Sequence, residues 1–319
     1  MSTMQAAVIA GSRTLQVSSV PKPAPAAGQV RIRLEGCGVC ASSLPVWEGR
    51  EWFNYPLDSG APGHEGWGVV DEVGDGVTAV KAGERVAFLS GRAFAEYDLA
   101  DEGSVVRIPD HFKIFPGEAI GCAMNIFRRS EIEAGQTVAI IGAGFLGNLV
   151  IQLAKSAGAR VVAISRREAA RELAKQCGAD VTIPMTDHWD IVRKVKEEIT
   201  EGRGAERVIE CVGTQWPLDI ANDIIGTRGR LVIAGYHQDG PRQVNMQNWN
   251  WLGLDVVNAH ERVPEAYVRG MQDGVDAVLA GRIDPWPLLT HTYALDQLDR
   301  ALNDVEARPD DFVKGTVLL

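Results

Sequence analysis

The sequence predicts an α/β protein in which a doubly wound parallel sheet is inserted between two parts of a β-rich domain. Strand-like and helix-like segments alternate between residues 137 and 259, which is typical of a parallel sheet with helical crossovers. Before residue 116 the chain lacks a long helical period, and residues 30–35 alternate apolar with polar side chains, as in a strand with one buried face. Another helix and a last strand, at 315–318, complete the β-rich part.

Length and charge restrict the class of function. The chain has 319 residues, which is enough for two domains, and its 32 basic and 42 acidic side chains give a formal net charge of −10. The excess of acid disfavours nucleic acid and anionic membrane as partners, because both need a basic surface. Five cysteines in this length do not form a disulfide framework, and the first residues lack the features of a signal peptide. We therefore expect a cytoplasmic globular protein.

The alternating region can be divided into strands and helices in chain order. Apolar runs predict buried strands, and segments with helical periodicity between them predict the crossovers. The predicted strands are 137–141, 161–164, 181–183, 208–211, 231–234 and 254–259, and the first three helices are 147–157, 167–177 and about 187–200.

A glycine-rich turn joins the first of these strands to the helix that follows. It has the GxGxxG pattern, with Gly142, Gly144 and Gly147 at the fixed positions and Phe145 and Leu146 between the last two. Gly142 permits a tight turn, Gly144 lets the backbone approach a pyrophosphate, and Gly147 lets the helix pack against the strand. Because a strand precedes the motif and a helix follows it, we interpret the turn as a dinucleotide site rather than an ordinary glycine turn.

The end of the second strand indicates which dinucleotide binds. An NAD site has an acidic residue there to accept from the ribose hydroxyls, whereas this chain has Ser165 followed by Arg166 and Arg167. A serine does not repel a 2′-phosphate, and a guanidinium can bind one through two hydrogen bonds. We therefore expect NADP(H) to be preferred over NAD(H); the alternative is that both arginines are solvated at a helix start.

Two short motifs in the β-rich part resemble a known family. Cys40 ends the run GCGVC, and His64 and Glu65 lie in PGHEG. In these motifs, and in their order relative to the glycine turn, the chain resembles the zinc-containing medium-chain dehydrogenase/reductases. The resemblance implies that Cys40 and His64 bind a catalytic zinc ion, one per subunit, and that Glu65 is a direct or exchanging ligand. Thiolate and imidazole suit zinc.

The resemblance spans the whole length and implies a domain organisation. Residues 1–118 and 263–319 would form a GroES-like catalytic domain, and residues 119–262 a Rossmann dinucleotide-binding domain. Relatives pair the last Rossmann strand across a two-fold axis, so a homodimer or homotetramer is expected.

The third zinc ligand has two candidates, Glu118 and Cys122. In the family this ligand lies about two dozen residues before the first fingerprint glycine; Glu118 lies 24 residues before Gly142 and Cys122 lies 20 before it. The segment from Glu118 also resembles that of the threonine dehydrogenases and, more loosely, the sorbitol dehydrogenases, where a glutamate is the ligand. The family's usual proline is replaced by Ala119. We favour Glu118.

Three further positions take roles from the resemblance. Ser42 matches the hydroxyl that contacts the reacting oxygen and begins the proton relay, which makes it a catalytic residue beside Cys40 and His64. Ser43 replaces the aspartate that usually orients the zinc histidine, so that orienting contact is in doubt. Lys314 matches a basic residue that meets the cofactor pyrophosphate.

These observations predict a zinc-dependent alcohol dehydrogenase that transfers hydride between NADP(H) and a secondary alcohol or polyol, or its ketone. The substrate class follows from the resemblance alone. A zinc-independent quinone or enoyl reductase and a non-catalytic NADP-binding protein are the alternatives, and metal analysis and a screen of alcohols would distinguish them.

Overall fold

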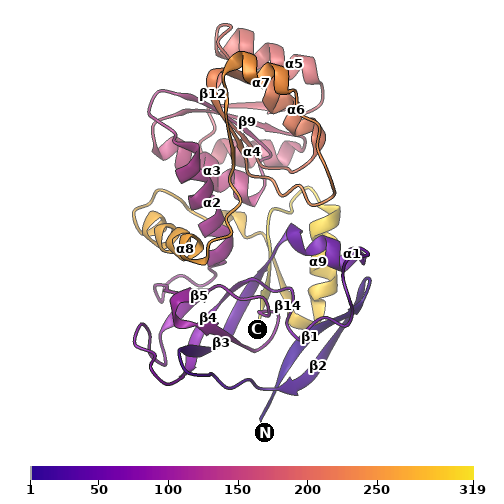
Figure 1. Cartoon of the computed structure of the whole chain (residues 1–319), viewed down its shortest axis with the longest axis vertical. Coiled ribbons are helices and arrows are strands. Elements are labelled where there is room, and N and C mark those ends of the chain that lie inside the picture. Colours follow the sequence, from indigo (N-terminus) through magenta and orange to yellow (C-terminus); the bar gives the residue numbers. More distant parts are fainter. Residues whose placement is uncertain (1) are drawn as a thin grey trace. The chain divides into compact units, whose positions relative to one another are not determined.

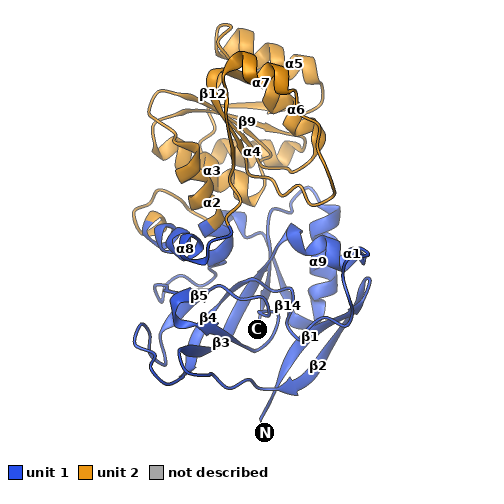
Figure 2. Ribbon diagram, in the orientation of Figure 1, with its two compact units in different colours: residues 1–121, 262–276, 286–319 blue, residues 122–261, 277–285 orange. Residues whose placement is uncertain are grey.

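The computed structural model describes residues 2–319 and is drawn with its elements labelled in Figure 1. The chain divides into two compact units, which Figure 2 shows in different colours. Unit 1 comprises the chain up to residue 121 together with 262–276 and 286–319, and unit 2 comprises 122–261 and 277–285. The segment 277–285 was predicted to belong with the GroES-like part. It lies in unit 2, where Gln152 bonds both backbone groups of Asp284, at 2.6 Å to its N–H and 3.1 Å to its carbonyl.

Unit 2 is the predicted doubly wound sheet. Its six strands lie in the order β10-β9-β8-β11-β12-β13, and every neighbouring pair is parallel. The chain order along this sheet reverses between β8 and β11, which is the dinucleotide-binding topology. The strands are β8 (Thr137–Ile141), β9 (Arg160–Ser165), β10 (Val181–Pro184), β11 (Ala205–Glu210), β12 (Ile225–Ile233) and β13 (Asp255–Asn258).

Helices connect these strands and cover the sheet, so the central strands are buried on both faces. Residues 138–141 and 161–164 are fully buried, which explains why these strands are continuous apolar runs rather than alternating ones. The helices are α3 (Phe145–Ser156), α4 (Glu168–Gln176), α5 (His188–Arg193) with a π-helical continuation over Lys194–Ile199, α6 (Gln215–Ile224) and α7 (Met246–Leu252).

Unit 1 is the β-rich part. A seven-stranded sheet has the order β14-β15-β3-β4-β5-β7, with β6 also paired to β3, and the hairpin β1-β2 forms a second sheet. Its strands are β1 (Thr3–Gly11), β2 (Thr14–Pro21), β3 (Gln29–Val39), β4 (Glu65–Val73), β5 (Arg85–Phe88), β6 (Tyr97–Asp101), β7 (Val105–Arg107), β14 (His291–Ala294) and β15 (Gly315–Leu318). The strand β15 from the end of the chain pairs with β3 from its beginning, which confirms that the C-terminal segment returns to the β-rich part.

Four α-helices begin in the described residues of unit 1. They are α1 (Leu44–Glu48), α2 (Gly117–Ser130), α8 (Pro264–Leu279) and α9 (Leu298–Ala307). The helices α2 and α8 carry the chain from unit 1 into unit 2. Within residues 2–319 we find no helix with the length and apolar character of a membrane span.

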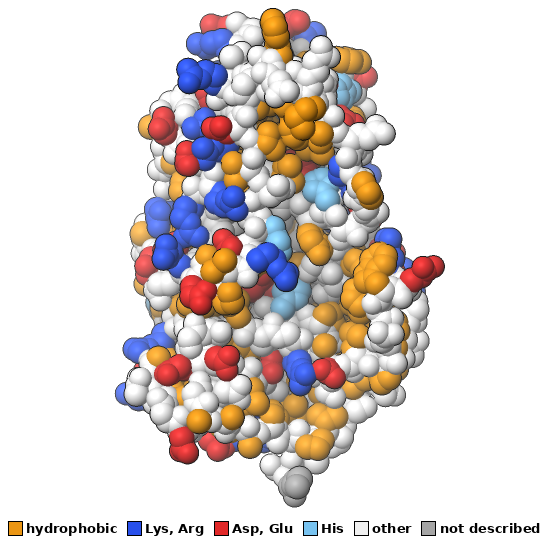
Figure 3. Space-filling model, viewed as in Figure 1, with side chains coloured by type: hydrophobic (Ala, Val, Ile, Leu, Met, Phe, Trp, Pro, Cys, Tyr) orange, Lys and Arg blue, Asp and Glu red, His pale blue; other side chains and the backbone are white. Residues whose placement is uncertain are grey.

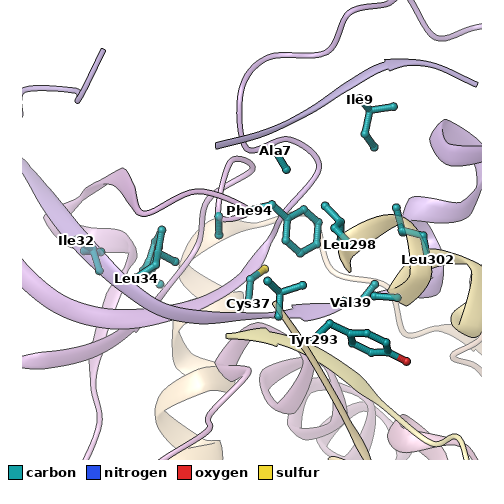
Figure 4. Close-up of a cluster of buried hydrophobic side chains, with 14 of the residues drawn as sticks. Ala7, Ile9, Ile32, Leu34, Cys37, Val39, Phe94, Tyr293, Leu298 and Leu302 are labelled. Atoms are coloured by element: carbon teal, nitrogen blue, oxygen red, sulfur yellow. The ribbon is translucent and has the colours of Figure 1, made fainter. Parts of the chain in front are cut away.

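The core of unit 1 is formed by one face of β3 and the elements packed on it. Ile32 and Leu34 are buried, as their alternation with charged residues predicted. Figure 4 shows them with Cys37 and Phe94 in the same apolar cluster. Cys37 is therefore a core residue, and burial raises the pKa of its thiol well above the usual value.

Candidate functional site

The predicted ligands Cys40, His64 and Glu65 lie together in unit 1, with their ligand atoms within 4.8 Å of one another. Cys40 directly follows β3, and Glu65 is the first residue of β4. Because β3 and β4 are antiparallel, with Gly38 opposite Glu65, the end of one strand and the start of the other meet at the same edge of the sheet. Sulfur, imidazole nitrogen and carboxylate oxygen form a donor set that zinc accepts.

Hydrogen bonds fix the orientation of the His64 ring. Its Nδ1–H donates to the carbonyl of Pro62 at 2.8 Å, since a carbonyl can only accept, and this leaves Nε2 directed toward the site. Ser42 Oγ lies 3.3 Å from that Nε2. Orientation by a backbone carbonyl replaces the aspartate that the family usually has, whose position is held by the buried Ser43. This contact could not be identified from the sequence.

The groups around His64 favour positive charge. Burial, the largest single influence, lowers the pKa of His64. The hydrogen bond and charge of Cys40 and the charges of Glu118 and Glu65 together outweigh burial and raise the pKa to about 10. A site that stabilises an imidazolium in this way also suits a cation bound between its thiolate and carboxylates. The residues present therefore fit the zinc ion that the resemblance implies.

Glu65 makes a second contact, with Lys314. The Nζ atom lies 2.6 Å from each carboxylate oxygen, and both side chains are buried. Burial lowers the pKa of Lys314, but the charges of Glu65, Cys40 and Glu118 outweigh it and raise the pKa above its usual value. Because the ammonium is bound to Glu65 here, the pyrophosphate contact predicted for Lys314 stays a prediction.

The two candidates for the third ligand lie one turn apart on α2. Glu118 is in the first turn and is half-buried, and its charge reaches both His64 and Lys314. It is not among the residues whose ligand atoms lie within 4.8 Å of one another. Cys122 is also half-buried and is not part of a disulfide. The choice of Glu118 over Cys122 thus stays a prediction, with the electrostatic contact to His64 in its favour.

The glycine turn in unit 2 has the geometry that its sequence predicted. Gly142 has a φ of +101°, which side-chain-bearing residues rarely adopt, and a Cβ on Gly147 would lie 1.9 Å from the Gly142 carbonyl. Gly144 is exposed at the N-terminal cap of α3, where Phe145 and Leu146 begin the helix. The turn therefore presents backbone to solvent at a helix N-terminus, as pyrophosphate binding requires.

The predicted cofactor-selecting residues lie at the end of the neighbouring strand. Ser165 is the last residue of β9, Arg166 is exposed, and Arg167 is the N-terminal cap of α4. Since β8 and β9 are adjacent and parallel, this turn and the glycine turn lie at the same edge of the sheet. The structure thus brings together the two features that the sequence assigned to the cofactor.

Sequence reasoning missed two polar residues that shape this edge. Asn148, buried in α3, donates through Nδ2 to the carbonyls of Ala143 and Gly144, at 3.1 and 2.9 Å, and so fixes the glycine turn. Glu210 is the last residue of β11 and is fully buried, and it accepts from the N–H groups of Val212 and Gly213, both at 2.7 Å. A polar side chain within an otherwise apolar run was the available signal in both cases.

Comparison with known proteins gives consistent matches over both units. The model of the alcohol dehydrogenase GroES-like domain matches residues 26–110, and the model of the zinc-binding dehydrogenase matches residues 146–271. An alcohol dehydrogenase of Geobacillus stearothermophilus is 35% identical over 266 residues, which cover 73% of this chain and 77% of that protein. A sorbitol dehydrogenase of Halalkalibacterium halodurans is 25% identical over 332 residues, with 93% and 94% covered.

A solved structure shows the same fold. The crystal structure of a protein described as a zinc-binding dehydrogenase from Sinorhizobium meliloti 1021, bound to NADP, superposes with a TM-score of 0.86 at 24% identity. The superposition covers 100% of both chains.

Proposed function

This chain belongs to the zinc-type medium-chain dehydrogenase/reductases, and on that premise we propose that it is a zinc-dependent oxidoreductase that transfers hydride between NADP(H) and a secondary alcohol or polyol, or the corresponding ketone. The observation that carries the proposal is the convergence of Cys40, His64 and Glu65 at one edge of the unit 1 sheet. The similarity of the chain to an alcohol dehydrogenase and a sorbitol dehydrogenase supports the substrate class.

Each residue of the site has a role in this proposal. Cys40, the Nε2 of His64 and Glu118 would hold the zinc ion, which when bound acts as a Lewis acid toward the substrate oxygen. Glu65, which is paired with Lys314, lies beside these ligands and would bind the zinc ion directly or exchange on and off it. Ser42 Oγ lies 3.3 Å from His64 Nε2, and its hydroxyl would relay the proton that an alcohol releases on oxidation, or the proton that the substrate oxygen takes up when a ketone is reduced.

The preference for NADP(H) is supported by the turn after β9. Ser165 puts no carboxylate at the end of β9, where the adenosine ribose would bind, and Arg166 is exposed beside it. The turn is basic although the whole chain has a formal net charge of −10, and a position that binds phosphate requires such a local positive charge.

The test combines metal analysis with turnover. We expect about one zinc ion per chain, NADPH-dependent reduction of ketones, and loss of that activity on chelation with recovery on adding zinc. Cys40→Ser should lose the metal and the activity. Cys177→Ser, which changes a half-buried thiol of unit 2, is the matched control and should keep both.

Two results would overturn the proposal. Full activity in zinc-free protein would identify a zinc-independent quinone or enoyl reductase. Tight binding of NADPH without turnover of any alcohol, polyol or ketone would identify a binding protein that keeps only the fold.

A further inference from the structure

We propose that Arg171 is a positioning residue for the 2′-phosphate of NADP(H), because it holds the turn that carries Ser165 and Arg166. The inference rests on the NADP preference proposed above and adds the residue that gives the selecting turn its shape. Arg171 lies in α4, one helical turn after Arg167, and is half-buried.

The contacts of Arg171 are with backbone rather than with acidic side chains. Its Nη1 donates to the carbonyl oxygen of Arg166 at 2.8 Å and to that of Ser165 at 3.1 Å. The Ser165 carbonyl also accepts from the N–H of Met185 at 3.1 Å, beyond the last paired residues of β10. Both carbonyls of the turn are therefore held by a charged donor, and charge-assisted bonds are stronger than neutral ones.

The turn needs such a donor because it lacks the usual cap. Serine, threonine, aspartate and asparagine are preferred at a helix N-terminal cap, where the side chain fixes the entry of the chain. Here Arg167 occupies that position, in an extended conformation with φ −75° and ψ 137°, and makes no side-chain cap bond. Arg171 fixes this turn by donating to the carbonyls of Ser165 and Arg166. No cap side chain therefore competes with a bound phosphate for the N–H groups of the first helical turn.

The local charge indicates that this arrangement serves an anion. Residues 165–175 contain four basic and two acidic side chains, although the whole chain has a formal net charge of −10. A cation near a helix N-terminus is unfavourable, because that end of the helix dipole is positive. Of the acidic neighbours, Glu172 bonds Lys175 at 2.7 Å, and Glu168 is exposed in the first turn. A phosphate bound at Ser165 and Arg166 would therefore meet a segment with a local excess of positive charge.

Binding of the two cofactors distinguishes this role from a general structural one. NADH lacks the 2′-phosphate, so its binding should depend less than NADPH binding on the exact shape of the turn at Ser165 and Arg166. The variant Arg171→Met keeps the length of the side chain and removes its donors and charge. Lys175→Met is the matched control, because it removes the same charge from the same helix one turn further on, where the ammonium bonds Glu172 and not the turn.

We would titrate wild type and both variants with NADPH and with NADH at one ionic strength. We expect Arg171→Met to raise the dissociation constant of NADPH about fivefold and to change that of NADH less than about twofold. We expect Lys175→Met to leave the ratio of the two dissociation constants unchanged. Arg171→Lys, which keeps the charge and one donor group, should regain part of the preference. Thermal unfolding of each variant shows whether the fold is intact.

If the ratio of the NADPH and NADH dissociation constants is unchanged in Arg171→Met, the role of Arg171 is overturned. It is also overturned if Lys175→Met changes this ratio equally, because that result would show an effect of charge at a distance. These outcomes leave the NADP preference of the wild type in place. A wild type without that preference would instead contradict the proposed cofactor and the role of Arg171 together. If Arg171→Met does not fold, the same two comparisons are made with Arg171→Lys.

Discussion

Lys314 and Glu65 form a buried ion pair in which the ammonium nitrogen lies 2.6 Å from each oxygen of the carboxylate. The residues are 249 positions apart in the sequence. Glu65 begins β4 beside His64, a candidate zinc ligand, and Lys314 directly precedes β15. The pair therefore connects the returning C-terminal segment to the strand that carries the candidate metal site, and the field of Lys314 acts on that site.

Removing Lys314 should destabilise the protein because it leaves the Glu65 carboxylate buried without its counter-charge. We expect Lys314→Met to lower the free energy of unfolding by about 3 kcal/mol, measured by urea denaturation. Adding Glu65→Gln should recover part of this loss. As a control, Lys155→Met breaks an exposed pair with Asp180 and should cost less than about 1 kcal/mol. Equal losses in the two single variants would contradict the idea that burial gives the Lys314 pair its effect.

The identity of the third metal ligand can be decided by metal content. Because the charge of Glu118 reaches His64, we expect Glu118→Ala to lower the zinc retained after dialysis sharply, together with activity. Cys122→Ala, one helical turn away, should leave most of the zinc in place. Elemental analysis of both purified variants gives the answer. Loss of zinc in Cys122→Ala alone would show that the spacing argument chose the wrong residue.

The sequence predicted best those features that depend on local pattern. The strand predicted at 137–141 is β8 with the same bounds, because a buried parallel strand is a continuous apolar run. The motifs containing Cys40 and His64 also identified residues that the fold brings together. Both predictions depend on a few neighbouring residues whose types are restricted by their chemistry.

Contacts made by tertiary structure were not accessible in this way. The hydrogen bond from His64 to the Pro62 carbonyl has no side-chain signature, since every residue has a carbonyl. Nothing in the local sequence joins Lys314 to Glu65, which the fold alone brings together. The sequence drew no attention to Arg171, because its bonds to the carbonyls of Ser165 and Arg166 depend on how the chain turns there.

Cofactor preference should decrease with either of two changes in the turn after β9, for different reasons. Ser165→Asp provides an acceptor for the ribose hydroxyls and repels a 2′-phosphate, so the preference for NADPH should shrink or reverse. Arg166→Ala should raise the dissociation constant of NADPH by about tenfold and leave that of NADH nearly unchanged, because a well-made charged hydrogen bond contributes about 1.5–3 kcal/mol. Fluorescence titration with both cofactors measures this. A wild type that binds them equally would mean that Arg166 stays in solvent.

The stability of unit 1 should depend on pH through Asp71. Asp71 on β4 accepts from Arg31 on β3 at 2.6 Å and from Lys22 at 3.1 Å. Burial raises the pKa of Asp71, but the hydrogen bonds and charges of Arg31 and Lys22 outweigh it, so the net pKa is lowered. A carboxyl whose pKa is lower in the folded state stabilises the protein above its unfolded pKa, near 4, and loses that contribution as pH falls through the folded value.

We therefore expect Asp71→Asn to reduce the free energy of unfolding by about 1 kcal/mol at pH 7 and by progressively less below about pH 4. Urea denaturation across this pH range measures the difference. Asp58→Asn, which breaks the exposed pair with Arg92, should show little effect at any pH. A loss in Asp71→Asn that stayed constant down to pH 2 would point to packing and not to charge.

Assembly is the last expectation, and it concerns the edge of the unit 2 sheet. The strand β13 pairs with β12 on one side only among the described residues, and an open edge of this kind is usually covered. On the preceding helix α7, Trp251 is 86% exposed and Met246 is 54% exposed. Figure 3 shows hydrophobic side chains gathered over the part of unit 2 that carries α6 and α7.

We expect a second copy of the chain to pair with this edge across a two-fold axis, which gives a dimer or a dimer of dimers. Trp251→Glu would bring a charge into that interface and should shift the protein toward monomer, as measured by light scattering at micromolar concentration. Trp52→Glu is the matched control, since Trp52 is 62% exposed in unit 1 and should leave assembly unchanged. A monomeric wild type at the same concentration would remove the expectation, because an open edge beside so exposed an indole would then be tolerated in isolation.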